Sequence, residues 1–397
     1  MGHGDNTIDR DAIGRLLGSM RRDIEADRYD GAVVSLVHRG EVVLEEALGW
    51  TERDRGRVAR TDDVFRVLSL TKAFTVVLVL KAVEEGLLAF TTPVVDVIPE
   101  FRGTDKFLDK YRTKLSVMDL LTHRSGLPAT PEPVGQDRLG DLRSVVAAIC
   151  AAGPIAEPGE TIDYSPAANH ALLGEMVRRV RGAAHYRDLV REQVFGPLGM
   201  QDSAIGAPRA WADRIVPLRA KFSQAGWLTG ADIESLNGVV DEDAELPWVG
   251  SVTTAHDVAR FAEMLRCGGA LDGTRIVSTA VLDRALRNHT GDQLNNWWIP
   301  MTQRRGWKPM PANLGLGFFL RGEGLHPSIL GTLTSPGTFG NYGAGSSLYW
   351  VDPERELTLV CLTAGIMEES QNIERFQRLS DLAVSSVVRR ERVPVMA

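Results

Sequence analysis

Three features are scarce in this sequence of 397 residues, and each scarcity excludes a class of protein. Cysteine occurs only three times and without C-x-x-C spacing, which excludes a disulfide framework and a cysteine-based zinc site. No stretch reaches 18 consecutive apolar residues, which excludes a predicted membrane-spanning helix. Positive charge is not in excess, because the net charge is −7, so nucleic acid and anionic membranes are not expected partners.

The cysteines and the polar start of the chain carry two further expectations. Cys150, Cys267 and Cys361 lie far apart and lack neighbouring histidines, so we expect reduced thiols buried in the core. The first ten residues are polar and lack the apolar segment of a signal peptide, which favours a cytoplasmic location.

The two ends of the chain carry strand and helix patterns, whereas the middle is mainly helical in its periodicity. The patterns at the two ends predict a helix at 8–26, strands at 31–37, 42–48, 346–351 and 357–363, and a helix at 371–388. The middle is predicted to hold helices at 117–121, 142–152, 169–181, 184–195 and 256–267, then an irregular loop at 288–313 and a strand at 314–320.

These patterns predict an α+β fold in which both ends of the chain contribute strands to one antiparallel sheet flanked by helices. The chain exceeds the roughly 250 to 300 residues at which a single core stops growing, so two lobes are expected. We expect one domain over 1–397, with an α/β lobe at about 8–66 and 314–390 and a mainly helical lobe at about 67–313.

A serine and a lysine stand three residues apart at the predicted start of a buried helix. Ser69 and Lys72 precede the apolar run 73–80, and residues three apart share one helix face, so the hydroxyl and the amine can meet. Apolar neighbours would desolvate Lys72 and lower its pKa, which allows an amine to act as a base. On the pair alone, an ordinary N-cap serine remains the alternative.

Two further segments can complete a nucleophilic site. Tyr164 precedes a predicted helix, and a phenol beside a lysine ammonium is drawn toward the phenolate, which can accept the serine proton. The glycine-rich run 340–345 stands ahead of the strand at 346–351, and glycines allow a backbone N–H to approach a substrate as an oxyanion donor. Each segment also has a plainer alternative, a core tyrosine and a simple turn.

Taken in this order, the segments resemble the serine β-lactamase and penicillin-binding-protein superfamily, most of all the branch with class C β-lactamases, D-aminopeptidases and family VIII carboxylesterases. Further similar segments extend over nearly the whole chain: 120–128 (LLTHRSGLP), 195–200 (FGPLGM), 250–261 (GSVTTAHDVARF) and 350–354 (WVDPE). Each is weak alone, but their common order is strong.

The resemblance implies a β-lactamase/transpeptidase-like fold with the site between an α/β lobe and a helical lobe. It implies that Ser69 is the acylated nucleophile and that Lys72 and Tyr164 share the general base and acid work. The backbone N–H groups of Ser69 and Ala344 would form the oxyanion hole. No metal and no organic cofactor are implied.

Two motifs depart from the family pattern. The second motif is usually Y-[AS]-N, but Pro166 stands where its amide belongs, and whether Asn169 replaces that amide stays open. The third motif is usually K-T-G or H-x-G, and here it reads Asn341, Tyr342 and Gly343, which we expect to contact the substrate. Both changes remove polar groups that hold the amide and the carboxylate of a β-lactam.

Aromatic side chains in the long loop at 288–313 are further substrate-binding candidates. We expect Trp297 and Trp298 to line the rim of the cleft, because clustered aromatics in a long loop suit an apolar ligand wall. The alternative is that both tryptophans pack beneath the loop.

A Ser-His-Asp arrangement is a competing interpretation of the same region. His123 or His170 would be its base, with Asp119 or Asp163 as the third member. This arrangement is disfavoured, because no G-x-S-x-G elbow surrounds any serine and His123 lies in a segment that the family uses structurally.

Together these features predict a serine hydrolase that forms an acyl-enzyme, acting on carboxylic esters of small or medium size. Amide hydrolysis, or acyl transfer to an alcohol or amine, is the near alternative because it uses the same intermediate. A non-hydrolytic binding or sensor protein on the same scaffold is the alternative of another class. The expected partner is therefore a small-molecule ester or amide, and no oligomeric state is predicted.

Overall fold

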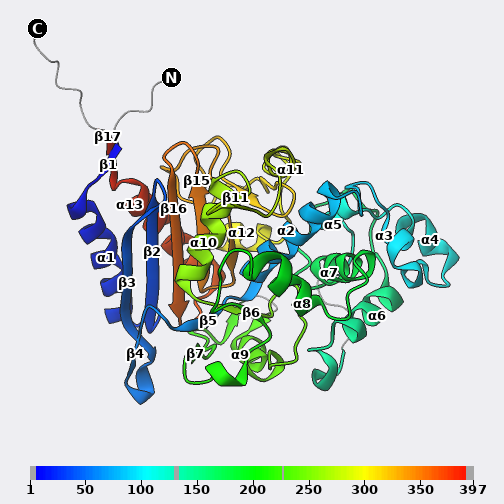
Figure 1. Ribbon diagram of the computed structural model, residues 1–397, viewed down its shortest axis with the longest axis horizontal. Helices are drawn as coiled ribbons and strands as arrows, with labels where there is room; N and C mark the ends of the chain where they lie inside the picture. The colour runs from blue at the N-terminus through cyan, green and yellow to red at the C-terminus, as the bar shows by residue number, and fades with distance from the viewer. Residues whose placement is uncertain (1–5, 129–133, 226–227, 390–397) are drawn as a thin grey trace, which may run out of the picture.

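The computed structural model describes residues 6–128, 134–225 and 228–389, and its central feature is an antiparallel sheet between layers of helices (Figure 1). Within these residues the main sheet has seven strands, in the order β13-β14-β15-β16-β2-β3-β4. They are β2 (Gly31–His38), β3 (Glu41–Glu52), β4 (Arg57–Val58), β13 (Phe319–Leu320), β14 (Phe339–Gly343), β15 (Ser347–Asp352) and β16 (Leu357–Ala364). Because β16 pairs with β2, the predicted sheet built from both ends of the chain is confirmed.

The hairpin between β2 and β3 follows from its turn. Arg39 and Gly40 both have positive φ, 56° and 84°, as a two-residue turn between right-twisted strands requires. Glycine adopts this conformation without a side-chain clash, and the turn sets His38 opposite Glu41.

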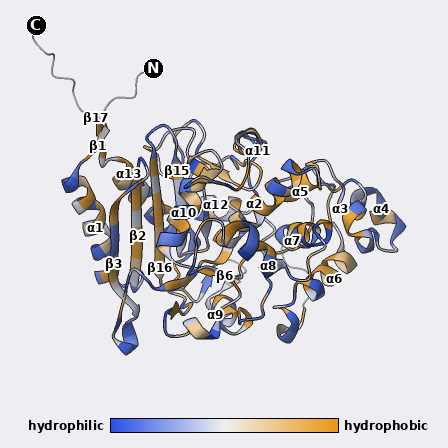
Figure 2. Ribbon diagram, viewed as in Figure 1, coloured by the Kyte–Doolittle hydropathy of each residue, from blue (hydrophilic) through white to orange (hydrophobic). Residues whose placement is uncertain are grey.

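The two faces of the sheet pack into two separate cores. Along β16, Leu359 and Cys361 point into one core, while Val360 and Leu362 point into the other, as the two-residue period of a strand dictates. Helices α1 (Arg10–Glu25) and α13 (Glu369–Val384) pack together on the first face, and α10 (Ala255–Arg266) covers the second. Figure 2 accordingly shows β2 and β16 mainly in the hydrophobic colour.

The remaining helices gather mostly beyond one edge of the sheet, around the buried helix α2 (Figure 1). They are α2 (Thr71–Glu84), α3 (Val94–Val97), α4 (Lys106–Arg112), α5 (Val117–Leu121), α6 (Leu142–Ala152), α7 (Ala168–Val180), α8 (Tyr186–Val190), α9 (Gly230–Val239), α11 (Thr279–Ala285) and α12 (Ile299–Arg305). The predicted helices at 117–121 and 142–152 are confirmed residue for residue. Although α10 falls within the range expected for the helical lobe, it packs on the sheet, and the division into two lobes stays a prediction.

Several short strands complete the fold. Next to the start of α2, a small four-stranded sheet consists of β5 (Val64–Arg66), β6 (Ala204–Ile205), β7 (Ile215–Val216) and β10 (Ser251–Thr253). Three two-stranded pairs are β1 (Asn6–Ile8) with β17 (Val387–Arg389), β8 (Gln224–Ala225) with β9 (Leu228–Thr229), and β11 (Ala270–Leu271) with β12 (Thr274–Arg275).

Some expectations from the sequence are wrong in detail. The predicted strand at 314–320 is reduced to β13, because Gly315 donates a backbone hydrogen bond to the carbonyl of Phe318 and folds the segment back on itself. The predicted irregular loop at 288–313 contains α12, which begins with a proline in its first turn. Cys267 is exposed rather than buried, whereas Cys150 and Cys361 are buried, and all three thiols are free.

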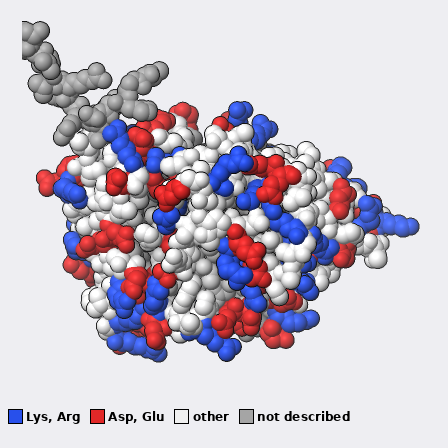
Figure 3. Space-filling model, in the orientation of Figure 1, with Lys and Arg blue, Asp and Glu red and all other residues white. Residues whose placement is uncertain are grey.

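Two properties of the described surface and helices bear on partners. None of the helices in the three described ranges has the length and hydrophobicity needed to cross a bilayer. On the face drawn in Figure 3, acidic and basic side chains are interspersed rather than gathered into fields of one sign.

Candidate active site

Ser69 lies in a 3₁₀ turn (Leu68–Leu70) that leads directly into α2. The residue before it, Leu68, has φ of 49°, a conformation that costs a residue other than glycine about 1 to 3 kcal/mol. The turn is held from outside, because the hydroxyl of Ser347 on β15 donates to the carbonyl of Val67 at 2.8 Å. A strained but anchored turn therefore presents the Ser69 hydroxyl at the start of the helix.

Two side chains from different parts of the chain converge on this hydroxyl. Lys72 Nζ lies 2.9 Å from Ser69 Oγ, and Tyr164 donates its hydroxyl hydrogen bond to the same oxygen at 3.0 Å. The predicted contact between Ser69 and Lys72 on one helix face is thus present. Tyr164, which is 95 residues away in sequence, completes a cluster of three reactive groups.

Lys72 is buried without a counter-charge, which disfavours its protonated form. Its side chain is 5% exposed, and burial lowers the pKa of Lys72 well below its ordinary value. Its second contact is the backbone carbonyl of Trp248 at 3.1 Å, and within the described residues it forms no ion pair. A neutral amine beside a serine hydroxyl is suited to accept its proton.

The environment of Tyr164 differs from the expectation that a lysine ammonium would draw it toward the phenolate. Burial raises the pKa of Tyr164, the hydrogen bond to Ser69 opposes this shift, and the charge of Glu369 adds to it. The expected phenolate is wrong because the hydroxyl of Tyr164 is itself buried, and desolvation disfavours its charged form. Tyr164 is therefore a neutral phenol, a form that can donate a proton.

The segment that carries Tyr164 is fixed on both sides. The N–H of Asp163 donates to the carbonyl of His123 at 3.0 Å, and the N–H of Asn296 donates to the carbonyl of Ile162 at 2.9 Å. The ring of Tyr164 also packs against His123, with 4.7 Å between ring centroids. These contacts hold the phenol in place over the serine.

The end of β14 brings Ala344 next to the serine turn. A Cβ on Gly343 would collide with the carbonyl oxygen of Val67 and with the hydroxyl of Ser347, so only glycine permits this close approach. Ala344 and Ser69 both line the same cleft. Their backbone N–H groups are candidates for the oxyanion hole, and this role stays a prediction.

His123 and Asn169 support the site from behind. Asn169 is fully buried, with its side chain 2.9 Å from Nδ1 of His123, and it accepts a hydrogen bond from Ser125 at 2.7 Å. Asn169 lines neither of the two cavities described below, and whether it replaces the missing amide of the second motif stays open. Burial is the main cause that lowers the pKa of His123 to about 3, and the protonated form of Lys72 acts in the same direction.

The Ser-His-Asp alternative does not match these contacts. The ring partner of His123 is an amide, and Asp119 is engaged in capping α5 through Ser116. Asp163 accepts hydrogen bonds from the side chains of Thr161 and Asn296. Both nitrogens of the buried His170 lack a hydrogen-bond partner among the residues described, so no carboxylate orients that ring.

A cleft of about 650 Å³ opens in front of the three reactive groups. Ser69 and Tyr164 line it, and most of its remaining wall is apolar: Leu68, Leu127, Ile155, Phe222, Ile233, Leu236, Trp297, Met301, Ile366 and Met367. This volume and lining are typical of a small-molecule site. A second, much smaller cavity of about 20 Å³ lies beside Ser69 and Lys72 and is bordered by His123, His170 and Asn341.

The two tryptophans expected at the rim have different surroundings. Trp297 lines the cleft, and its ring centroid lies 5.3 Å from that of Tyr164. Trp298 is 8% exposed, stacks on Phe319 and belongs to the core beneath the sheet, so its placement at the rim is wrong. Helix α12 begins immediately after Trp298 and turns the two adjacent side chains in different directions.

The third-motif residues also divide between the cavities. Tyr342 borders both, whereas Asn341 borders only the small one and is 3% exposed. One N–H of the Asn341 amide donates to the carbonyl of Gly317 at 3.1 Å, and Oδ1 has no hydrogen-bond partner among the described residues. Gly343 has no side chain, and this absence allows the close approach of β14 to the serine turn that is described above.

Sequence reasoning missed two contributors to the site. Trp248 supplies the carbonyl that holds Lys72, and it follows a loop that carries no recognisable motif. Glu369, the first residue of α13, lines the cleft with Tyr164 and Ala344. Two adjacent glutamates shortly after a fully buried strand were the available signal, but acidic residues at a helix start are usually assigned to capping.

Comparisons with known proteins agree with this geometry. Residues 19–380 match the family described as Beta-lactamase. The chain is 27% identical over 361 residues to Esterase/beta-lactamase LipL of Mycobacterium tuberculosis, covering 82% of this chain and 75% of that protein. It is 31% identical over 281 residues to Penicillin-binding protein 4 of Amycolatopsis lactamdurans, covering 70% and 69%.

A solved structure described as a family VIII carboxylesterase superposes on this fold with a TM-score of 0.77 at 23% identity, covering 96% of this chain and 100% of that one. This likeness extends over both the sheet and the helices that surround the site. The chain therefore belongs to the beta-lactamase family and is a serine hydrolase.

Proposed function

We propose that this protein hydrolyses carboxylic esters of small to medium size through an acyl-enzyme on Ser69. The observation that carries the proposal is the convergence on Ser69 Oγ of Lys72 Nζ at 2.9 Å and of the Tyr164 hydroxyl at 3.0 Å. Both distances lie within the reach that proton transfer requires.

In the first half of the reaction, the neutral amine of Lys72 takes the proton of Ser69 as Oγ attacks the ester carbonyl. The oxygen of the tetrahedral intermediate is held by the backbone N–H groups of Ser69 and Ala344. The neutral phenol of Tyr164 gives its proton to the departing alcohol and regains one from the Lys72 ammonium. The acyl group is then bound to Ser69 Oγ.

In the second half, water attacks the acyl carbonyl and loses a proton to Lys72. Ser69 Oγ leaves as the carbon–oxygen bond breaks, and it recovers its proton from the Lys72 ammonium. The net reaction consumes one ester and one water and releases one carboxylic acid and one alcohol. An amine or alcohol in place of water would give acyl transfer, and an amide in place of the ester would give amide hydrolysis, so these remain the near alternatives.

Two features favour esters over β-lactams. The cleft wall is mostly apolar, which suits neutral acyl and alcohol groups. Asn341 stands where the family has lysine or histidine, and its neutral amide, one N–H of which is bonded to Gly317, supplies no positive charge for a carboxylate. The names of Esterase/beta-lactamase LipL and of Esterase EstB of Burkholderia gladioli point to the same class of substrate.

A non-hydrolytic binding or sensor protein is the alternative from another class. The intact cluster of Ser69, Lys72 and Tyr164 argues against it, because the burial that neutralises Lys72 serves proton transfer and contributes nothing to ligand binding alone.

The test is a comparison of kcat/KM for p-nitrophenyl butyrate and nitrocefin at one pH and ionic strength, with Ser69→Ala as the control. We expect the ester to be the better substrate by about ten- to a hundredfold, which is the selectivity that loss of one charge-assisted hydrogen bond to the carboxylate costs. Equal or better turnover of nitrocefin would contradict the ester assignment.

A further inference from the structure

One carboxyl group in the cleft has no place in the reaction described above. Glu369 begins α13 and lines the cleft together with Ser69, Tyr164 and Ala344. Its oxygen Oε1 is buried and has no hydrogen-bond partner among the residues that the structure describes. An unpartnered buried acceptor is costly, and in a ligand cleft it is an available contact for the ligand.

The other carboxylates of the cleft are already engaged. Glu368 caps α13 by accepting from the N–H of Ser370 at 2.9 Å, and its second oxygen lies 3.5 Å from Arg304. Asp163 accepts hydrogen bonds from Thr161 and Asn296. Among the described residues that line the cleft, Glu369 is thus the carboxylate with an oxygen that accepts no hydrogen bond.

The ionisation of Glu369 depends on neighbours from several elements. Burial raises the pKa of Glu369 to about 7 and the charge of Glu368 adds to this, whereas Tyr342, the backbone N–H of Gly345 and Arg375 oppose it. Glu369 in turn raises the pKa of Tyr164. Its charge is therefore sensed at the catalytic phenol.

We propose that Glu369 selects substrates by charge, favouring esters with a cationic ammonium group near the scissile carbonyl and disfavouring those with a carboxylate. A cation is stabilised beside the free oxygen within mostly apolar walls, whereas an anion is repelled by the carboxylate. The inference rests on the proposed ester hydrolysis and adds to it a specificity-determining residue. Because the carboxyl group changes charge near neutral pH, the discrimination grows as pH rises through this range.

Three thioesters of similar shape and different charge provide the test: acetylthiocholine, its neutral isostere 3,3-dimethylbutyl thioacetate, and S-acetyl-3-mercaptopropionate. The charge of acetylthiocholine is permanent, and the carboxylate of the anionic thioester stays ionised above pH 6. A pH effect on the ratio of kcat/KM values therefore reports on the enzyme. The variants are Glu369→Gln, which keeps the shape, and Glu374→Gln, which removes a charge on the same helix outside the cleft.

We expect the cation-to-anion ratio of kcat/KM to fall about tenfold or more in Glu369→Gln at pH 8 and to stay unchanged in Glu374→Gln. In the wild type the ratio should drop between pH 8 and pH 6, and in Glu369→Gln it should be flat. An equal ratio in wild type and Glu369→Gln overturns the inference. A wild-type ratio that does not change with pH overturns it as well, and this measurement does not depend on the folding of any variant. Absence of Ser69-dependent turnover of the neutral thioester would instead refute the proposed hydrolysis.

Discussion

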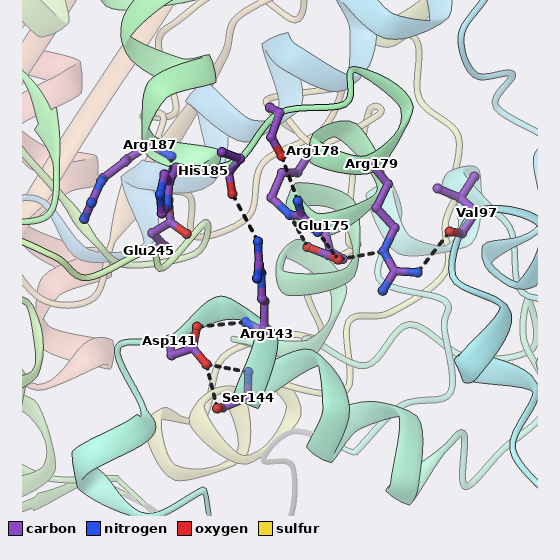
Figure 4. Close-up of polar contacts among 12 residues, drawn as sticks. Val97, Asp141, Arg143, Ser144, Glu175, Arg178, Arg179, His185, Arg187 and Glu245 are labelled. Carbon is purple, nitrogen blue, oxygen red and sulfur yellow. Dashed lines mark hydrogen bonds and ion pairs between the residues drawn. The ribbon is translucent and has the colours of Figure 1, made fainter.

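Two buried ionisable side chains on neighbouring helices have opposite surroundings. Lys72 on α2 contacts a hydroxyl and a carbonyl and forms no ion pair with any described residue. Glu175 on α7 is 1% exposed and lies between two arginines, with Oε2 2.8 Å from Nε of Arg178 and Oε1 2.6 Å from Nε of Arg179 (Figure 4). Both side chains are removed from water, yet only Glu175 has counter-charges.

The difference decides what each group can do. Burial alone would raise the pKa of Glu175, but the hydrogen bonds from Arg178 and Arg179 outweigh it, and the pKa is lowered. Glu175 therefore stays charged and pairs with two arginines of its own helix. The unpaired Lys72 has its pKa lowered by burial, which suits the proposed role of a base, so the presence or absence of a counter-charge separates the two groups.

Ser69→Ala should show the largest effect on activity. We expect ester kcat/KM to fall by about four orders of magnitude or more, because the variant lacks the nucleophile. The urea midpoint should change little, since alanine is well accommodated at a helix start. Wild-type turnover by this variant would refute the role of Ser69 as the nucleophile.

Lys72→Ala should lower kcat/KM by about three orders of magnitude, and adding Tyr164→Phe should cost far less than the two single losses combined, because the groups act as a unit.

In the wild type, kcat/KM should rise with pH through the lowered pKa of Lys72, since only the neutral amine accepts the serine proton. A pH–rate profile between pH 5 and 10 measures this, and a profile that falls over the same range would contradict a neutral base.

Trp297 and Trp298 offer a second comparison, between a side chain that lines the cleft and a neighbour that packs in the core. Trp298→Ala should destabilise the protein by about 3 kcal/mol or more, because it leaves a cavity in the core. Trp297→Ala should instead change the preference among p-nitrophenyl esters of different acyl length several-fold, with little change in the urea midpoint. If Trp297→Ala destabilised the protein and Trp298→Ala changed the acyl-length preference, Trp298 rather than Trp297 would line the cleft.

Glu175→Gln should destabilise the protein by about 2 to 3 kcal/mol without changing ester kcat/KM, because it leaves two arginines without their shared carboxylate. Since the pKa of the folded-state carboxyl is lowered, its contribution is complete above the ordinary glutamate pKa of 4.5 and is lost as pH falls below it. Urea unfolding at pH 7 and pH 3.5 should show the difference between wild type and variant shrinking at the lower pH. Glu157→Gln, which removes an exposed ion pair with Lys114, is the control and should have no measurable effect.

The sequence predicts the reactive pair well because its geometry is local. Ser69 and Lys72 meet wherever the segment is helical, and glycine and β-branched patterns likewise predict the β2–β3 hairpin. The neutral state of Tyr164 and the engaged donor of Asn341 depend on burial and on partners far away in sequence, which no local pattern contains. The same applies to Trp298, whose direction is decided by where α12 begins.

Labelling with a fluorophosphonate, read by intact-protein and peptide mass spectrometry, tests most directly the claim that a neutral Lys72 activates Ser69. The account predicts one adduct per chain on the peptide that contains Ser69, no adduct in Ser69→Ala, and strongly slowed labelling in Lys72→Ala. An adduct of equal yield in Ser69→Ala, or unchanged labelling in Lys72→Ala, would contradict it.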